Sequence, residues 1–585
     1  MTSSAPDTKV GGPPETYYGN SNPDLLNIIP VTARRIVEFG CGSGALCADF
    51  KTRNAATTYI GVEMHAPSAE RARMILDHVV CDDAEDPAVI DRLLAEHGTV
   101  DVLVYGDTIE HFVDPWRTLE SHLRLLAPDG VVCACVPNSQ HWSLSVRLLA
   151  GHMEYSEKGG LNDRTHLHLF TKSSIRTFFE NFGLTITKTH QRKFGSTPAS
   201  VQDICKVVAN ATKTDGAEMY EGLTTFQYVV QAARPTDDRQ WHIDWRTLQT
   251  LGGFSYVRAV APARFMETIP NVSAALHEKD ANVRHVSGSA NIFVWQRPIL
   301  MPENDLLNIR KLQYRKKLII TDFDDDPELW PSIAENKNLT FVGAHAVQVS
   351  TEELRQKILP LNPHTFVVPN RIPAVSPYAE VRARTVENTI FVGGFNRARD
   401  FEPIADTVNR FIERSAIPWH FYVVGDRRIL DMLKTDRRDF FKVTPYKQYR
   451  GLLEKADIAL LPLKDTPSNR LKSNLKFLEA AAAGAVTLAG TTIYADTVEH
   501  GRTGYLFDTP DALETLLESL DDRDALERVR KAAHDYVQRN AMLAPGVQGT
   551  LDIYYDLYER YETLDRELNE RLARVLPPES LPPNP

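Results

Sequence analysis

The stretch RRIVEFGCGSGALC at residues 34–47 decides the first part of the fold. An apolar run leads into Gly40, Gly42 and Gly44, and a helix-like run follows them. We expect a strand, a tight turn and a helix, because glycine adopts positive φ freely and lets backbone N–H groups approach a ligand closely. A nucleotide would bind beyond the carboxyl end of such a strand. The glycines alone are also compatible with a tight turn that binds nothing.

The spacing of the glycines separates two kinds of nucleotide. The pattern G-x-G-x-G differs from the G-x-G-x-x-G of dinucleotide-binding enzymes, which bind a pyrophosphate. Glu63 ends the next expected strand, TTYIGVEM at residues 57–64. An acidic side chain about 20 residues beyond the glycines can accept both ribose hydroxyls. The sequence therefore favours a nucleoside cofactor without a pyrophosphate.

The composition is that of an ordinary globular protein. The chain has 585 residues, of which 43% are hydrophobic and 24% charged. The formal net charge of -11 argues against a dedicated nucleic-acid binder but allows a local basic cleft for phosphates. No stretch approaches the ~20 apolar residues of a membrane span, and the start, MTSSAPDTKVGGPPE, lacks the regions of a signal peptide. We expect a cytoplasmic protein, with peripheral membrane contact and oligomeric state left open.

The cysteines show no paired metal-ligand spacing. We interpret them as small thiols in a reducing compartment rather than as a disulfide framework or a zinc site. The six are Cys41, Cys47, Cys81, Cys133, Cys135 and Cys205.

Strand-like runs alternate with helical patterns along nearly the whole chain, which predicts an α/β protein with parallel sheets. We expect three Rossmann-like doubly wound domains, the last two sharing a cleft. The expected parts are a disordered lead (1–19), a first domain (20–235), a second (236–382), a third (383–545), and a long helix with a proline-rich tail (546–585).

Local signals place several elements. EDPAVIDRLLAEHG at residues 85–98 predicts a helix with Asp86 as N-cap, Pro87 in the first turn and Gly98 as its stop. FSYVRAVAP at residues 254–262 reads as the first strand of the second domain, and SPYAEVRARTVEN at residues 376–388 as a linker.

The first domain resembles the class I S-adenosylmethionine-dependent methyltransferases over residues 20–234. The resemblance rests on VEFGCGSG, GVEM, VVCDDAED, VDVLVYGDTIEHFVDPWRTL, LAPDGVVCACVPN and DRTHLHLFTKSSIRTFFENFGL. It implies that Glu38 orders the methionine end of S-adenosyl-L-methionine, Glu63 the ribose and Asp82 the adenine. The implied cofactor-binding residues are Glu38, Gly40, Gly42, Gly44, Glu63, Met64 and Asp82.

Methyl transfer to oxygen needs an aligned acceptor and often a base for its proton. His111 follows Glu110 at the end of the fourth expected strand, where such sites lie. His166 and His168 lie in the segment THLHLF, and Asp107 could hold the methionine amine or the acceptor. A lone histidine is more often structural than catalytic. We take Asp107, Glu110, His111 and His166 as candidate catalytic residues and expect no metal.

A second site is indicated by SNRLKSNLKFLEAAAAGAVTLAG at residues 468–490. Lys472, Asn474, Lys476 and Glu479 lie just before or within a small-residue helix, whose start offers free N–H groups to a phosphate. The two lysines would share a helix face if both were helical. Lysines for a diphosphate and a carboxylate for a ribose would suit a sugar nucleotide. A solvated charged face is the alternative.

This region resembles the C-terminal domain of glycosyltransferases with the two-Rossmann (GT-B) fold, especially the retaining group. The resemblance covers residues 245–545 and rests on TIFVGGFNRARDF, HFYVVGDR, YKQYRGLLEKADIALLPLK, SNLKFLEAAAAGAVTLA and TVEHGRTGYLF, with AHAVQVSTEELRQKILPLNPHTFVVPNRI before them. It implies a nucleotide-sugar donor as co-substrate, phosphate contacts from Arg397 and a ribose contact from Glu479.

One position departs from the family pattern. The retaining family often has two glutamates separated by seven residues, and Leu471 stands where the first would be. Asp324, Asp325 and Asp326 resemble a metal-binding run, but this fold usually needs no metal for transfer. We interpret the three as an acidic loop that faces the cleft and contacts the acceptor.

The two resemblances together imply a bifunctional enzyme. It would methylate a glycan hydroxyl and transfer a sugar to a glycan, in bacterial surface polysaccharide or glycoconjugate synthesis. Two alternatives stay open. The chain could be a methyltransferase with an inactive, glycan-binding GT-B module, or a scaffold protein in which both sites are degenerate.

Overall fold

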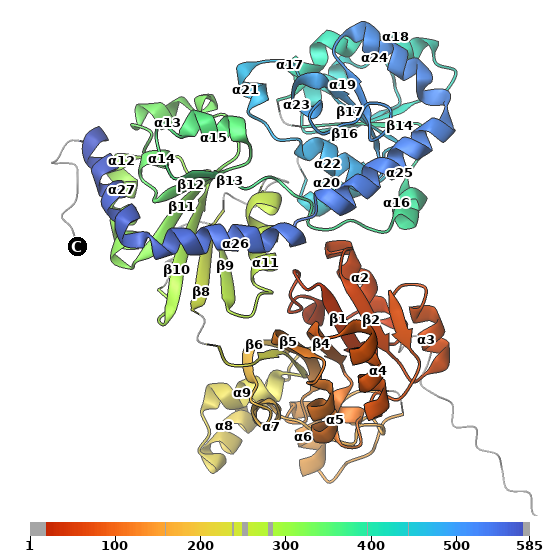
Figure 1. The fold of residues 1–585 in the computed structure, drawn as a ribbon, viewed down its shortest axis with the longest axis vertical. Coiled ribbons are helices and arrows are strands. Elements are labelled where there is room, and N and C mark those ends of the chain that lie inside the picture. The colour runs from red at the N-terminus through yellow and green to blue at the C-terminus, as the bar shows by residue number, and fades with distance from the viewer. Residues whose placement is uncertain are drawn as a thin grey trace, which may run out of the picture. The chain divides into compact units, whose positions relative to one another are not determined.

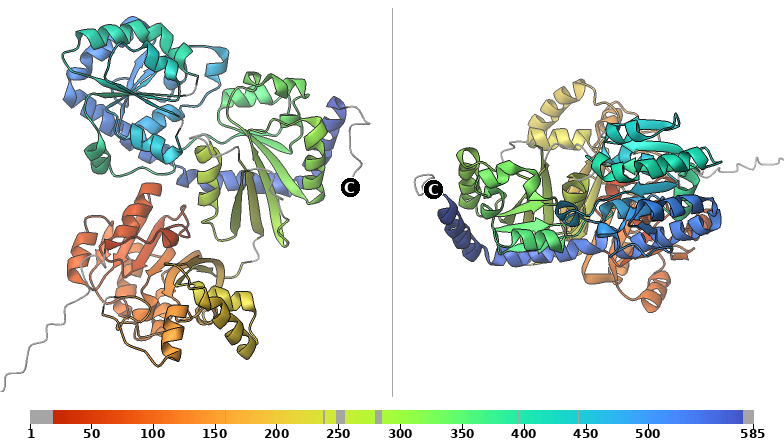
Figure 2. Two further views of the ribbon diagram at one scale, coloured as in Figure 1. Left: turned by 180° about the vertical axis from the view of Figure 1, so that it is seen from behind. Right: turned by 90° about the horizontal axis from the view of Figure 1, so that it is seen from above.

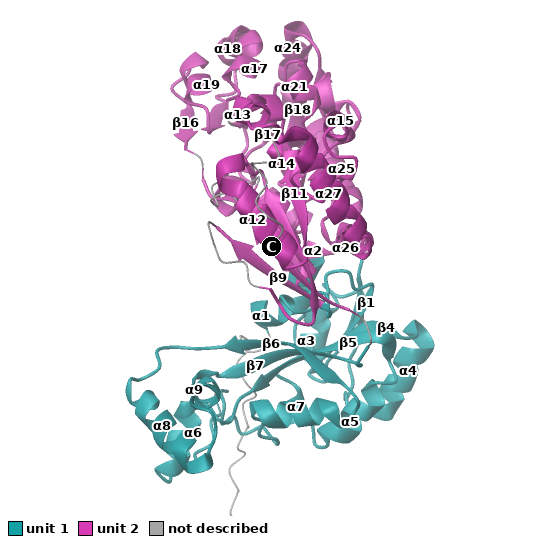
Figure 3. Cartoon of the chain, turned by 90° about the vertical axis from the view of Figure 1, so that its left-hand side faces the viewer, with its two compact units in different colours: residues 1–51, 56–238, 268–271 teal, residues 52–55, 239–267, 272–585 magenta. Residues whose placement is uncertain are grey.

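The computed structural model describes residues 19–157, 159–236, 239–247, 255–278, 285–394, 396–442 and 444–576. The chain divides into two compact units (Figure 3). Unit 1 comprises residues 1–51, 56–238 and 268–271, and unit 2 comprises residues 52–55, 239–267 and 272–585. Apart from Gly19, the predicted disordered lead lies outside the described residues, as do residues 577–585 of the predicted proline-rich tail.

In the described part of unit 1, seven strands form one sheet in the order β3-β2-β1-β4-β5-β7-β6 (Figure 1). β7 is antiparallel to β5 and β6, and the other pairs are parallel. The strands are β1 (Arg35–Phe39), β2 (Thr58–Val62), β3 (His78–Val80), β4 (Val100–Gly106), β5 (Leu126–Pro137), β6 (Thr185–Arg192) and β7 (Gln227–Ala233). The helices are α1 (Pro23–Leu26), α2 (Ala45–Arg53), α3 (Ala66–Ala72), α4 (Pro87–His97), η2 (Ile109–His111), α5 (Pro115–His122), α6 (Trp142–Leu149), α7 (Lys172–Glu180), α8 (Ser200–Thr212) and α9 (Gly216–Thr224).

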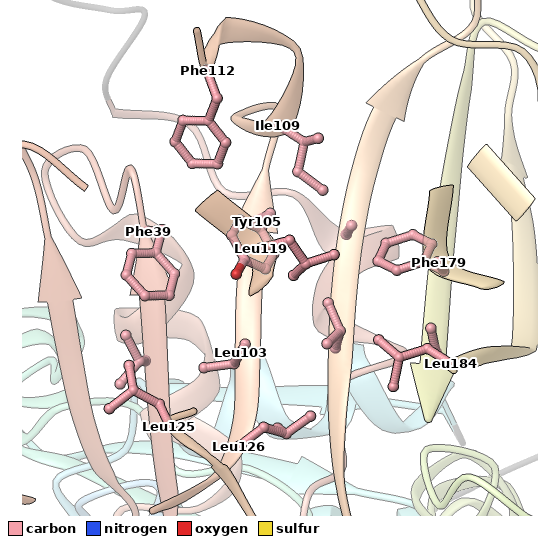
Figure 4. Close-up of a cluster of buried hydrophobic side chains, with 14 of the residues drawn as sticks. Phe39, Leu103, Tyr105, Ile109, Phe112, Leu119, Leu125, Leu126, Phe179 and Leu184 are labelled. Carbon is pink, nitrogen blue, oxygen red and sulfur yellow. The ribbon is translucent and has the colours of Figure 1, made fainter. Parts of the chain in front are cut away.

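Both faces of this sheet are buried. Along β4, Leu103 and Tyr105 join one apolar cluster, while Val102 and Val104 join another, because successive strand residues point to opposite faces. Figure 4 shows the first cluster, in which the Tyr105 ring stacks on Phe39 at 5.4 Å between centroids. Two buried faces are typical of a doubly wound sheet, and the predicted fold class is confirmed here.

The helix predicted from residues 85–98 is confirmed as α4. The side chain of Asp86 accepts a 2.9 Å hydrogen bond from the N–H of Ala88, and Pro87 opens the helix. Gly98 ends it with a φ of 67°. Capping chemistry acts over a few residues, so the sequence alone was sufficient to place both ends.

Unit 2 contains two parallel sheets, each six-stranded within the described residues. The first has the order β13-β12-β11-β10-β8-β9 and the second β16-β15-β14-β17-β18-β19. Elements around the first sheet are β8 (Gln240–Arg246), η3 (Tyr256–Val260), α11 (Ala261–Met266), β9 (Val272–His277), β10 (Ser289–Gln296), α12 (Pro302–Tyr314), β11 (Lys317–Phe323), η4 (Pro327–Leu329), α13 (Pro331–Glu335), α14 (Leu339–Val342), β12 (Ala346–Val349), α15 (Glu352–Ile358) and β13 (Thr365–Val367).

Elements around the second sheet, followed by the two helices that end the described chain, are α16 (Tyr378–Arg384), β14 (Thr389–Gly393), α17 (Ala398–Phe401), η5 (Glu402–Ile404), α18 (Ala405–Arg414), β15 (His420–Val424), α19 (Arg427–Met432), β16 (Arg438–Phe441), α20 (Tyr446–Leu453), β17 (Ile458–Leu461), α21 (Pro467–Arg470), α22 (Leu475–Ala482), β18 (Val486–Gly490), α23 (Thr491–Tyr494), β19 (Tyr505–Phe507), α24 (Pro510–Glu518), η6 (Ser519–Asp521), α25 (Arg523–Asn540), α26 (Ala544–Glu559) and α27 (Tyr561–Val575).

The strand predicted at residues 254–262 is wrong. Its described residues are helical and form η3 and the start of α11, with Val257, Ala261 and Phe265 buried at helical spacing. The strand at this place in the series is β8, in which the buried residues Trp241, Ile243 and Trp245 occupy every second position. A short apolar run does not by itself distinguish a strand from a buried helix.

Two further expectations need correction. The predicted linker contains α16, whose Tyr378 and Arg382 bond the Glu527 carboxylate of α25. The predicted long C-terminal helix is two helices, α26 and α27, with a break at Arg560 (Figure 2). α27 packs Leu568 and Leu572 into the apolar cluster of the first sheet. An amphipathic pattern runs through both helices, so periodicity alone did not reveal the break.

Candidate active sites

The glycine-rich segment after β1 forms the predicted tight turn. Gly40, Gly42 and Gly44 have φ values of 72°, 55° and 86°, in the left-handed region that favours glycine. A Cβ at Gly44 would lie 2.6 Å from Cδ1 of Leu76, so the turn also needs the missing side chain. The turn lies at the carboxyl end of the sheet, where open α/β folds bind ligands.

Two glutamates lie beside this turn. The Glu63 carboxylate accepts hydrogen bonds from the N–H of Gly42 at 2.9 Å and of His65 at 2.8 Å. Glu38 is buried and accepts a 3.0 Å hydrogen bond from the Tyr59 hydroxyl. Burial raises the pKa of Glu38 to about 8, and the neighbouring Glu63 adds to the increase. The backbone thus fixes the orientation of Glu63 before any ligand binds.

A cavity of about 1250 Å³ opens at this edge of the sheet. It is lined by all the predicted cofactor-binding residues except Gly44, and by all four candidate catalytic residues. Met64 is 74% exposed at the cavity wall, and Asp82 pairs with Arg92 at 3.2 Å. His168 is not part of the lining, because its Nε2 bonds the Val113 carbonyl and its ring packs on Trp116. The predicted residues that line the cavity are Glu38, Gly40, Gly42, Glu63, Met64, Asp82, Asp107, Glu110, His111 and His166.

Asp107 follows β4 in an unusual backbone conformation. Its φ is 54°, which costs a non-glycine residue free energy and is often associated with functional sites. Its carboxylate accepts hydrogen bonds from the Gln227 amide and, at 3.4 Å, from the Cys135 thiol. Burial raises the pKa of Asp107 to about 6, although both hydrogen bonds oppose the increase.

Glu110, His111 and His166 form a compact group on the same wall. One nitrogen or carboxylate oxygen from each lies within 4.8 Å of the others. Glu110 is 1% exposed, and neither of its oxygens has a hydrogen-bond partner in the described structure. Burial raises the pKa of Glu110 and lowers the pKa of both histidines. The expectation of no metal missed this group, because His166 comes from a distant segment of the chain.

The sequence analysis did not identify several polar residues of the lining, among them Arg192, Gln227 and Asp163. Arg192 lies at the end of β6 and donates a 2.8 Å hydrogen bond to Gln227, the first residue of β7. Asp163 precedes the THLHLF segment and bonds Thr165. Because β7 is antiparallel, its first residue lies at the carboxyl edge of the parallel strands. Only the antiparallel pairing of β7 shows that Arg192 and Gln227 reach this edge, and patterns in a single sequence do not reveal that pairing.

In unit 2, Lys476 and Glu479 lie within α22, and Asn474 is its N-cap residue. Glu479 is buried, and its Oε2 accepts hydrogen bonds from Lys476 at 3.0 Å and from the Tyr449 hydroxyl at 3.2 Å. Its Oε1 is buried and has no hydrogen-bond partner among the residues that the structure describes. Arg397, Lys476 and Glu479 all act electrostatically on the hydroxyl of Tyr494, whose pKa is raised chiefly by burial. The structure thus joins Lys476 and Glu479 directly, whereas the Arg397 side chain bonds Asp400 at 3.0 Å.

Lys472 and Asn474 lie outside this arrangement of side chains. Lys472 precedes α22, so the condition under which both lysines would share one helix face is not met. Its Nζ bonds the Asp325 carboxylate at 3.1 Å. Asn474 is the N-cap residue of α22, and its side chain donates a 2.9 Å hydrogen bond to Thr497.

Leu471, at the position of the absent glutamate, is 8% exposed. Its side chain belongs to an apolar cluster of the first sheet that includes Phe323, Val349 and Leu354. The carbonyl of Leu471 accepts a 2.9 Å hydrogen bond from Thr351. This segment therefore contributes an apolar contact where the family pattern has a carboxylate.

The acidic run of unit 2 is fully paired with cations. Asp324 bonds Arg297 at 2.5 Å, Asp325 bonds Lys472, and Asp326 bonds Lys357 at 2.7 Å. Burial alone would raise the pKa of Asp324, but Arg297 and Arg258 outweigh it and lower this pKa. Arg297 also lies 3.8 Å from Asp325. Because each aspartate already pairs with a lysine or an arginine, the three do not form a common metal site.

The comparisons with known proteins follow the division seen in the structure. Residues 20–189 match the family model of a methyltransferase domain, and residues 387–522 match that of glycosyl transferases group 1. The chain thus contains a methyltransferase domain and a group 1 glycosyltransferase domain.

Individual relatives match only parts of the chain. The ubiquinone biosynthesis O-methyltransferase of Neisseria meningitidis serogroup A is 26% identical over 30% of this chain and 62% of its own length. The tRNA (guanine-N(7)-)-methyltransferase of Xanthomonas campestris pv. campestris is 29% identical over 19% of this chain and 41% of its own length. The chain thus spans less than two thirds of these curated relatives. Anabaena HepE, solved with UDP and glucose, is 11% identical over 54% of this chain and all of its own, with a TM-score of 0.39.

Among the helices of the described residues, none combines the length and the apolar character that a membrane crossing requires.

Proposed function

We propose that the chain is a bifunctional enzyme that methylates a hydroxyl of a glycan and extends a glycan with a sugar from a nucleotide donor. The observation that carries the first activity is the unit 1 cavity. There the glycine turn, Glu38 and Glu63 adjoin Asp107, Glu110 and His111 within one lining. This arrangement suits a nucleoside cofactor beside a second substrate.

The residues of unit 1 divide between two tasks in this proposal. S-adenosyl-L-methionine supplies an activated methyl group when bound. Glu63, already oriented by two N–H groups, has further lone pairs for the ribose hydroxyls. Asp107, Glu110, His111 and His166 bind and align the acceptor, and one of these carboxylates or imidazoles accepts the acceptor's proton as its oxygen receives the methyl group. An oxygen atom as the methyl acceptor is supported by the similarity to the ubiquinone biosynthesis O-methyltransferase.

The second activity rests on Glu479 and its neighbours. A buried carboxylate oxygen of Glu479, which has no hydrogen-bond partner in the described part of the chain, lies beside a lysine near the start of a helix. In the proposed complex this oxygen of Glu479 accepts a hydrogen bond from a ribose hydroxyl, while Lys476 and Arg397 bind the diphosphate. The match of residues 387–522 to group 1 glycosyltransferases supports the same use.

A binding module in place of the second enzyme is a specific alternative. It is favoured by Leu471, because the carboxylate that would contact the donor sugar is absent and its position is packed with apolar atoms. Full-length protein incubated with radiolabelled UDP-glucose, UDP-N-acetylglucosamine and GDP-mannose distinguishes the two. Transfer or donor hydrolysis supports an enzyme, whereas nucleotide binding without either supports the module.

The acceptors are tested in cells. We expect glycans from cells that lack the protein to lose both a methyl ether and a sugar residue in mass spectra. Restoring the gene with Glu63→Ala should return the sugar but not the methyl ether, and restoring it with Glu479→Ala should do the reverse. Unchanged glycans in the deletion would contradict the proposed glycan substrates.

A further inference from the structure

We propose that Glu110, His111 and His166 form a binding site for one divalent transition-metal ion in the wall of the unit 1 cavity. The three residues offer two imidazoles and one carboxylate, a ligand set that suits Zn²⁺, Fe²⁺ or Mn²⁺. All three line the cavity, so an ion held by them would be open to a second substrate.

The spacing of the three groups is close to the spacing that a single ion requires. Ligand atoms bound to one ion at about 2.1 Å lie at most about 4.2 Å apart. Glu110 Oε1 and His166 Nε2 are 4.0 Å apart, and all three ligand atoms lie within 4.8 Å of one another. Small side-chain rotations would complete the set without a change in the backbone.

The histidine rings are already oriented for coordination. His111 Nδ1 lies 3.1 Å from the Thr165 carbonyl, which can only accept a hydrogen bond, so Nδ1 carries the proton and Nε2 keeps its lone pair. The His166 ring is likewise hydrogen-bonded to the backbone of Leu161. Metal-binding histidines typically have their second nitrogen held by such a carbonyl. The two rings meet edge to face at 4.8 Å between centroids.

Glu110 gives an independent reason for a ligand at this place. Its carboxylate is almost fully buried at the cavity wall, and neither oxygen has a hydrogen-bond partner in the described structure. A buried carboxylate without partners is costly unless something compensates its charge. Asp107 and Asp163 add negative charge around it. A cation would bind the Glu110 oxygens and offset the negative charge around them.

Three protein ligands leave at least one coordination position open. An acceptor hydroxyl that binds the ion at this position would be held in place, and its pKa would be lowered. This consequence rests on the proposed methyl transfer, whereas the binding of the ion does not. Asp107 would then remain as a carboxylate of the lining that does not bind the ion. The acceptor class is narrowed to hydroxyl compounds that can bind a metal ion, such as vicinal diols.

The test uses full-length protein stripped with a chelator and titrated with Co²⁺, Zn²⁺ and Mn²⁺. We expect one tight equivalent, and visible Co²⁺ absorption bands typical of nitrogen and oxygen ligands. Glu110→Gln and His166→Gln should each lower the metal affinity at least tenfold. His168→Gln is the matched control on the same segment, outside the cavity, and should leave the affinity within twofold.

Measuring the affinity for S-adenosyl-L-methionine tests the metal site and the proposed methyl transfer independently. The variants should bind S-adenosyl-L-methionine with unchanged affinity, which also shows that they are folded. Absence of saturable binding of all three ions would overturn the proposal. So would equal affinity in Glu110→Gln, His166→Gln and the wild type, because the ion would then bind elsewhere. Failure of S-adenosyl-L-methionine to bind the wild type would contradict the proposed function but not the metal site.

Discussion

The Thr351 hydroxyl donates a 2.9 Å hydrogen bond to the carbonyl of Leu471 and thereby links α15 to the segment before α22. The Leu471 side chain lies in the same apolar cluster as Leu354 of α15. The residue that departs from the two-glutamate pattern therefore joins the two sheet domains of unit 2. It is a packing position in this chain, whatever the second activity proves to be.

We predict that Leu471→Glu lowers the stability of the protein instead of improving sugar transfer. Placing a carboxylate in this apolar cluster should cost about 3 kcal/mol or more, because a buried charge there has no partner. Leu471→Met conserves volume and should cost less than about 1.5 kcal/mol. Denaturant unfolding followed by tryptophan fluorescence measures both. Equal stability of Leu471→Glu and the wild type would show that the side chain can leave the cluster.

Glu63 is the residue of unit 1 whose substitution should affect the cofactor most. We expect Glu63→Ala to weaken S-adenosyl-L-methionine binding about 10- to 100-fold, since hydrogen bonds to a charged group contribute about 1.5–3 kcal/mol. The loss would combine the ribose contact with the release of the Gly42 and His65 N–H groups. Isothermal titration calorimetry on the full chain measures the affinity. Glu70→Ala, an exposed carboxylate of α3, is the matched control and should change nothing.

The glycine turn gives a prediction in which two costs can be separated. Gly44→Ala forces a side chain into a φ of 86° and against Leu76, whose Cδ1 would be 2.6 Å away. We expect a loss of about 2–4 kcal/mol from strain and overpacking together. Gly151→Ala has a similar φ of 81° but nothing within 4 Å, so it should cost only about 1 kcal/mol. Similar losses in both variants would mean that Leu76 moves aside.

Local signals predicted the parts of this fold that depend on a few neighbouring residues. Asp86 and Gly98 delimit α4 because a cap and a left-handed glycine act within one turn of helix. The prediction of a strand at residues 254–262 is wrong because the apolar residues of this run suit a strand and a buried helix equally. Only the pairing of β8 with β10 decides that β8 is the strand here.

The candidate site shows the same limit. Glu63 and the glycine turn were predictable because each follows a strand at the carboxyl edge of the sheet. Glu38 lies within β1 and was named only by the family resemblance. Glu110 and His111 were found, like Glu63, because they follow a strand. Their grouping with His166 was not, because the segment after residue 160 returns to the cavity through tertiary packing. There, His168 donates its backbone N–H to the carbonyl of Glu110 at 3.2 Å.

The docking of α27 on the first sheet of unit 2 should depend on pH. His345 is fully buried and lies 3.2 Å from the Asp565 carboxylate of α27. Burial lowers the pKa of His345, although Asp565 opposes the shift. Burial alone would raise the pKa of Asp565, but hydrogen bonds from His345 and Gln313 outweigh it, and the pKa is lowered. Both groups thus bind protons less readily in the docked state than in the undocked state.

A lowered pKa in the docked state means that docking loses stability as the pH falls. For His345 the loss begins below its undocked value of about 6.5, and for Asp565 only below about 3.9. We therefore expect amide hydrogen exchange in α27, corrected for intrinsic rates, to be faster at pH 5.5 than at pH 7.5. His345→Gln removes the titrating group and should reduce this difference, while the exposed variant His500→Gln of the second sheet domain should leave it unchanged. Protection of α27 that is equal at both pH values in the wild type would contradict the role of His345.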